Sequence, residues 1–90
     1  MVEVKGKNKK SVGILTFDGN VLEIFGFAHK HASRRIHVDQ IVGLIKENNG
    51  LTIGFGEGII SIFYTEGCEN IDELINAIIS ASNNHDLIVK

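Results

Sequence analysis

The sequence predicts a mainly β domain with one helix near its C-terminal end, and three observations support this fold class. Seven short runs rich in β-branched and aromatic residues are each closed by a turn residue. Three glycine-containing turns between these runs favour antiparallel hairpins. One later segment repeats its apolar residues at helical spacing. The 90 residues suffice for one small domain.

The predicted strands alternate large apolar residues with small or polar ones, most clearly over residues 51–55. Asp18-Gly19, Asn49-Gly50 and Gly56–Gly58 mark hairpin turns, because Asp, Asn and Gly tolerate the positive φ of tight turns. Glu66-Gly67 is expected to end the last strand. The seven strands are expected at Val2–Lys5, Val12–Phe17, Val21–Phe27, Arg34–Val38, Ile41–Lys46, Leu51–Phe55 and Ile59–Tyr64.

The predicted helix, Ile71–Ser82, has its own start signal. Asn70 stands where a capping side chain accepts free backbone N–H groups, and Glu73 follows at capping-box spacing. The tail at 85–90 ends on apolar residues and is an eighth edge strand, a docking segment or a linker. The apolar stripe that we expect to pack on the sheet comprises Ile71, Leu74, Ile75, Ile78 and Ile79.

Two segments resemble recurrent patterns of small bacterial PH-like domains. The stretch Gly13–Gly19, followed by Val21–Ile24, is similar to their opening hairpin, and Arg34–Ile41 is similar to one of their strands. Over residues 2–82 the chain resembles the DUF4429-type domain. This resemblance implies a pleckstrin-homology fold over residues 1–84, which is a seven-stranded antiparallel barrel of two near-orthogonal sheets capped by the helix. It implies no catalytic residue.

Composition and charge narrow the class of protein. The chain is 43% hydrophobic and 22% charged, and no apolar run approaches the roughly 20 residues that span a bilayer. The lone Cys68 leaves no internal disulfide, so a soluble cytoplasmic protein is expected. Residues 1–37 carry seven Lys and Arg against three acids, and residues 38–90 carry two against eight. This asymmetry gives a two-faced surface unless neighbouring strands mix the two halves.

An anionic membrane surface or small anion is one candidate ligand. Phosphoinositide-binding PH domains place basic residues around the first hairpin, and lysines surround the expected first turn, Gly6–Lys10. The second strand lacks the Arg that lipid-binding members carry, and a solvated lysine-rich turn is the simpler interpretation. The candidate anion-binding residues are Lys5, Lys7, Lys9, Lys10, Lys30, Arg34 and Arg35.

Three histidines are candidate metal ligands. His29, His31 and His37 offer imidazoles of the kind that bind zinc, nickel or copper. A closed site usually needs four ligands, and no acid or thiol adjoins His29 and His31, so a solvated polar loop is the alternative. Because Lys30 and Arg34 lie nearby in the sequence, a pH-sensing role is a further alternative.

The third predicted strand is apolar on both faces, which is unusual where one face meets solvent. Val21, Phe25 and Phe27 are expected on one face, and Leu22 and Ile24 on the other. The first set is the candidate interaction surface, either for a partner protein or for a second copy of the chain. The absence of proline leaves strand edges without one common guard against pairing.

Catalysis and nucleic-acid binding are not expected. The chain has no Gly-x-Ser-x-Gly elbow and no P-loop, and the glycines at 54, 56 and 58 belong to a hairpin. Its net charge of −2 and lack of a basic strip interleaved with aromatics disfavour nucleic acid. The sequence therefore predicts a non-enzymatic interaction or assembly module without a cofactor. Anion binding, and a histidine-based metal or pH-sensing role, are the alternatives.

Overall fold

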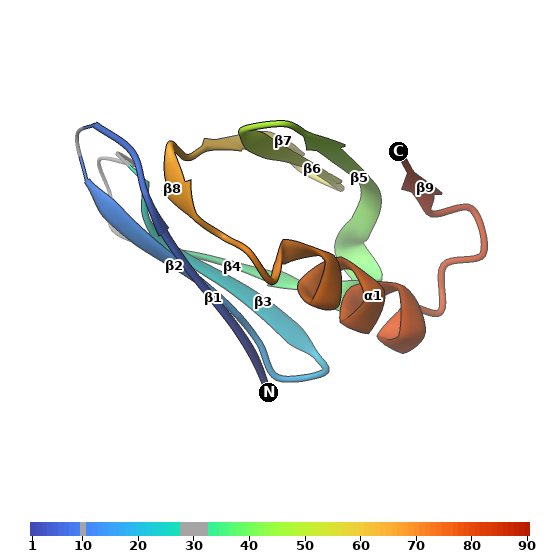
Figure 1. The fold of residues 1–90 in the computed structure, drawn as a ribbon. Coiled ribbons are helices and arrows are strands. Elements are labelled where there is room, and N and C mark those ends of the chain that lie inside the picture. The colour runs from blue at the N-terminus through green and yellow to red at the C-terminus, as the bar shows by residue number, and fades with distance from the viewer. Residues whose placement is uncertain (10, 28–32) are drawn as a thin grey trace.

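The computed structural model describes residues 1–9, 11–27 and 33–90, and these residues form two sheets and one helix. Figure 1 shows the sheets facing one another, with the helix α1 (Ile71–Ala81) across one end. The first sheet has the order β4-β3-β2-β1-β8 and the second β7-β6-β5-β9. The strands are β1 (Val2–Lys7), β2 (Val12–Phe17), β3 (Val21–Gly26), β4 (Ser33–His37), β5 (Ile41–Glu47), β6 (Gly50–Phe55), β7 (Gly58–Phe63), β8 (Glu66–Gly67) and β9 (Ile88–Val89).

All seven predicted strands are present, and their ends differ from the prediction by at most two residues. Val38 does not belong to β4, because it begins a single 3₁₀ turn, η1 (Val38–Gln40), between the two sheets. The mainly β class, the two sheets and the C-terminal helix are therefore confirmed. The described strands form no closed barrel, so the seven-stranded PH-like barrel is not confirmed.

Two further strands are short and depend on a neighbouring strand. Glu66-Gly67 does not end β7 but forms β8, which pairs antiparallel with β1. The tail forms β9, which pairs parallel with β5. The Lys46 N–H donates to the Lys90 carbonyl at 2.8 Å, and the Lys90 N–H donates to the Leu44 carbonyl at 2.9 Å. Of the three interpretations of the tail, the edge strand is the one observed.

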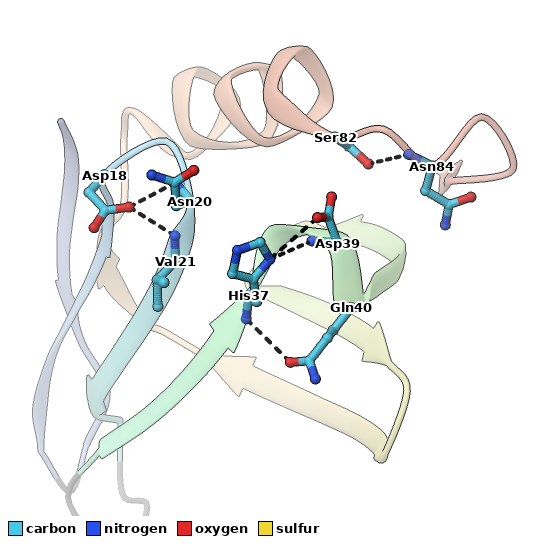
Figure 2. A network of polar contacts seen from close by, with 8 residues as sticks. All are labelled: Asp18, Asn20, Val21, His37, Asp39, Gln40, Ser82 and Asn84. Carbon is cyan, nitrogen blue, oxygen red and sulfur yellow. Dashed lines mark hydrogen bonds and ion pairs between the residues drawn. The ribbon is translucent and has the colours of Figure 1, made fainter.

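The hairpin between β2 and β3 forms around the predicted Asp18-Gly19 turn (Figure 2). Asp18 Oδ1 accepts the backbone N–H groups of Asn20 and Val21, each at 2.8 Å. These bonds, chiefly that from Val21, lower the pKa of the Asp18 carboxyl. Because the folded chain favours the carboxylate, their stabilising effect is complete above the ordinary Asp pKa and is lost as pH falls through the lowered one.

The helix packs four of its five predicted apolar residues into the core. Ile79 is exposed and lies outside the buried stripe. The predicted side-chain cap is wrong, because Asn70 does not bond to the first turn. Its amide Nδ2 instead donates to the Glu3 carbonyl at 2.8 Å, which ties the start of the helix to β1. The buried residues of α1 are Ile71, Leu74, Ile75 and Ile78.

The core lies between the two sheets and against the helix. Leu15 and Ile24 from the first sheet, and Leu44 and Ile53 from the second, are almost completely inaccessible to solvent. Their neighbours in sequence point to the opposite faces because side chains alternate along a strand. Each sheet therefore has one buried face and one face toward solvent. Among the described residues, no polar or charged residue is buried.

Candidate interaction site

Four glycines lie side by side across the first sheet. Gly67 on β8 is paired with Gly6 on β1, which is paired with Gly13 on β2, and Gly13 is paired with Gly26 on β3. A Cβ atom on Gly13 would overlap the ring of Phe27, and one on Gly6 would overlap Cys68 Sγ. This glycine row therefore lets Phe27 and Cys68 pack directly against the backbone of the sheet.

Phe27 and Cys68 reach these positions through two similar backbone corners. Gly26 and Phe27 have consecutive positive φ angles of 74° and 56°, and Gly67 and Cys68 have 85° and 60°. Phe27 N–H donates to the Val12 carbonyl at 3.2 Å. The Gly26-Phe27 corner directs the aromatic ring into the core, where Phe27 is 5% exposed. The assignment of Phe27 to an exposed interaction surface is therefore wrong, because the left-handed corner reverses the alternation of β3.

The same corner leaves a groove on the solvent face of the sheet. Regular alternation would have placed Phe27 outside, next to Val12, since β2 and β3 are paired up to Gly13 and Gly26. The groove has a volume of about 630 Å³ and the glycine row runs along it. Val12 is 73% exposed and Phe25 37% exposed. The outward side chains around the groove are Lys5, Lys7, Val12, Ile14, Phe25 and Glu66.

The groove unites parts of two candidate sites. Lys5 and Lys7 come from the predicted anion-binding set, whereas Phe25 comes from the predicted interaction surface. Val21 lies on the same outer face of β3 and is half-buried. Val12 and Ile14 were not among the predicted site residues, although β2 shows the same two-sided apolar pattern as β3. Its residues 12 and 14 are apolar on one face, while residues 15 and 17 are apolar on the other.

Each lysine that lines the groove has a carboxylate next to it. Lys5 Nζ lies 3.4 Å from Glu3 Oε1, and Lys7 Nζ lies 3.1 Å from Glu66 Oε2. All four side chains are largely exposed, so each ion pair contributes little to stability. The carboxylates do, however, offset the positive charge that a bound anion would need. Lys9, in the connection between β1 and β2, is exposed.

The predicted arginines lie elsewhere on the sheet. Arg35 points to the outer face of β4, where its Nε is 3.5 Å from Glu23 Oε1. Two strands separate β4 from β1, which places their backbones about 14 Å apart at the usual strand spacing of about 4.8 Å. Arg34 is the neighbour of Arg35 in the strand, and its guanidinium lies 5.2 Å from the centre of the Phe55 ring and 3.6 Å from Glu57 Oε2.

The described basic residues therefore do not converge on one anion site. Lys10 and Lys30, which were also candidates, lie outside the described residues. Two of the ion pairs, Lys7 with Glu66 and Arg34 with Glu57, join the basic and acidic halves of the chain. The strands themselves hardly mix the two halves. Among the described residues, β1 to β4 of the basic half are joined in the first sheet only by β8 of the acidic half, and all four strands of the second sheet belong to the acidic half.

The histidine candidates receive no support as a metal site from the part of the chain that is described. His29 and His31 lie outside it. His37 Nδ1 accepts the Asp39 backbone N–H at 3.2 Å, while Gln40 Oε1 accepts the His37 N–H (Figure 2). His37 thus helps to begin η1. Among the described residues, no three His, Cys, Asp or Glu side chains are grouped to hold a metal ion.

Cys68 is buried beside the glycine row and is 3% exposed. Burial, and secondarily the charge of Glu69, raises the pKa of its thiol. The raised pKa means that the folded chain holds the thiol proton more tightly than the unfolded chain. The contribution of this thiol to folding stability is therefore highest below the ordinary thiol pKa, where the thiol is protonated in both states. It falls as pH rises from the ordinary pKa through the raised one, because the unfolded chain ionises first.

We expect Cys68 to react slowly with a thiol reagent in the folded protein. At mildly alkaline pH the rate with an aromatic disulfide reagent should be roughly tenfold or more below that of the urea-unfolded chain, because burial reduces both thiolate fraction and access. The measurement is the rate of absorbance change with and without urea. Equal rates in the two conditions would contradict the burial of this thiol.

Comparison with known proteins gives no match: no protein-family model, no curated protein and no solved structure matches the chain. Among the helices that the structure describes, none is long and apolar enough to cross a membrane.

Proposed function

We propose that the chain is a non-enzymatic interaction module whose groove on the first sheet binds an extended apolar segment of a partner protein. The observation that carries this proposal is the exposure of Val12 and Phe25 around a hollow on the solvent face. The solvent face of an antiparallel sheet is usually polar. Apolar side chains gathered around a concave surface are typical of a binding site.

Charge favours a protein segment over an anionic membrane as the occupant. Lys5 and Lys7 are each paired with a carboxylate, and Arg35 lies three strands away from β1. An anionic headgroup would have to compete with Glu3 and Glu66 for these cations. An apolar segment needs only the exposed side chains and backbone of the groove.

The proposal includes a PH-like identity for the fold. The seven main strands divide between two antiparallel sheets and are followed by a helix, which is the order that the resemblance implies. The groove lies on the first hairpin of this arrangement and extends to β3 and β8. A cytoplasmic location is part of the proposal because a single buried thiol requires no oxidising compartment.

The test is a selection of linear peptides from a random library displayed on phage, with the whole chain as the target. We expect enrichment of peptides with bulky apolar residues. Phe25→Ser and Val12→Ser should each weaken the best peptide roughly tenfold or more by fluorescence anisotropy, since loss of a buried apolar contact is worth more than about 1.4 kcal/mol. The matched control is Val42→Ser, an exposed apolar residue on the second sheet.

Two results would contradict this function. Peptides that bind Phe25→Ser and Val12→Ser as tightly as the parent chain would exclude the groove. Salt-sensitive sedimentation with anionic but not neutral vesicles, lost in a Lys5→Gln, Lys7→Gln double variant, would favour the anion-binding alternative instead. Circular dichroism of each variant verifies that the fold is retained.

A further inference from the structure

The second sheet ends in a strand that lacks the usual protection of an edge. The described sheets have four edge strands, and β8 and β9 are only two residues long. The edge strand β4 carries Arg34 and Arg35. By contrast β7, Gly58–Phe63, has six residues and no charged side chain. Long, uncharged apolar edges are rare in monomeric proteins because they pair with other strands.

The register of the β6–β7 hairpin shows which backbone groups face outward. Tyr64 N–H donates to the Asn49 carbonyl at 3.1 Å, which marks a hydrogen-bonded pair at the open end of this hairpin. Bonded and non-bonded positions alternate in an antiparallel ladder, so the even-numbered residues of β7 bond to β6. The N–H and C=O groups of Ile59, Ser61 and Phe63 therefore point away from β6, toward the free edge.

The side chains of these three residues share the solvent face of the second sheet. Ile59 is 73% exposed and Phe63 is 63% exposed, while Ser61 Oγ lies 3.1 Å from Thr52 Oγ1. Asn8 Nδ2 donates to the Phe63 carbonyl at 3.2 Å, but a carbonyl oxygen has a second lone pair and accepts another bond. The free edge thus has a small polar residue between two large apolar ones.

We propose that β7 pairs antiparallel with β7 of a second copy of the chain, about a two-fold axis at Ser61. This pairing places Ser61 opposite its own copy and Ile59 opposite Phe63 of the second copy. A β-branched residue opposite an aromatic one is a favourable cross-strand pair, and no like charges meet. The pattern of Ile59, Ser61 and Phe63 is complementary to itself when reversed, which favours a second copy over an unrelated strand. The second sheet of each copy (Figure 1) then joins that of the other copy in one continuous sheet.

This dimer goes beyond the proposed function, because the groove lies on the first sheet and does not include β7. Phe25→Ser should therefore leave the dimer unchanged. A chain that does not dimerise could still bind peptides in the groove, and a chain that binds no peptide could still dimerise.

The test uses sedimentation velocity of the whole chain over a wide range of concentration. We expect the parent chain to form a dimer, and Ser61→Lys and Ser61→Glu each to lose it, because like charges would meet at the two-fold axis. An equimolar mixture of the two variants should restore a dimer, because opposite charges would then meet. Val42→Lys is the matched control, since Val42 is exposed two strands away on the same sheet and its variant should still dimerise.

Several outcomes would overturn the proposal. These are a parent chain that stays monomeric at every concentration, a dimer that survives both Ser61 variants, and a mixture that remains monomeric. Loss of the dimer in Val42→Lys as well would indicate packing of sheet faces and would also overturn edge pairing.

Amide hydrogen exchange provides a second measurement that needs no variant. In the parent chain the amides of Ile59 and Ser61 should become protected as concentration rises. Fast exchange of these amides at all concentrations would contradict the pairing.

Discussion

Replacing Gly26 with alanine is expected to lower the free energy of unfolding by about 3 kcal/mol or more. Gly26 has a φ of +74°, a conformation that strains alanine by about 1–2 kcal/mol. An added Cβ would also overlap the Val12 carbonyl oxygen, and a backbone atom cannot rotate away from it. The whole domain is expected to have a stability of only about 5–13 kcal/mol, so the loss is a large part of the total.

Urea unfolding followed by circular dichroism measures this effect. The matched control is Gly56→Ala, because Gly56 lies in a turn with open space where a Cβ would stand. Its change in unfolding free energy should stay within about 0.5 kcal/mol. Similar losses in the two variants would contradict the close contact between β2 and β3 at Gly26.

The second large effect concerns Phe27. Phe27→Ala should lower the free energy of unfolding by about 3–5 kcal/mol, because the buried ring leaves a cavity in the core. Gly13→Ala should lower it by about 1–3 kcal/mol, because the added methyl overlaps the same ring. In the double variant the methyl at position 13 has room, so the combined loss should be smaller than the sum of the two.

A double-mutant cycle with urea unfolding tests this coupling. We expect the shortfall from additivity to be about 1–2 kcal/mol, as found for residues in direct contact. Fully additive losses would show that the ring does not lie on the backbone of Gly13. The cycle needs no assumption about function, because each variant is compared only by its unfolding curve.

The long strands were predictable because each buries one face, and burial imposes a period of two on the sequence. The turns were predictable because Asp18-Gly19 and similar pairs have a local conformational preference. The two-residue strands β8 and β9 were not predicted from alternation, since two residues show no period. They form because β1 and β5 supply backbone partners that are far away in the sequence.

The errors in the candidate site have equally specific causes. Alternation assigned Phe27 to the outer face because it assumes an extended backbone, and a positive φ at a phenylalanine is rare. Gly26 before it was the only local sign of the corner. The capping role of Asn70 failed because β1 brings the Glu3 carbonyl within its reach. The basic cluster failed because successive residues of β4 point to opposite faces, as Arg34 and Arg35 show.

The corner at Gly26 and Phe27 couples the shape of the outer face of the first sheet to the packing of its inner face. The positive φ angles turn the Phe27 ring from the solvent face into the core. The depth of the groove and the packing of the core therefore depend on the same two residues. In the proposed peptide site, substitutions at Gly26 or Phe27 should therefore change both the peptide affinity and the Tm. Val12, Ile14 and Phe25 only line the groove, so substitutions there should change the specificity of the proposed peptide site and leave the fold intact.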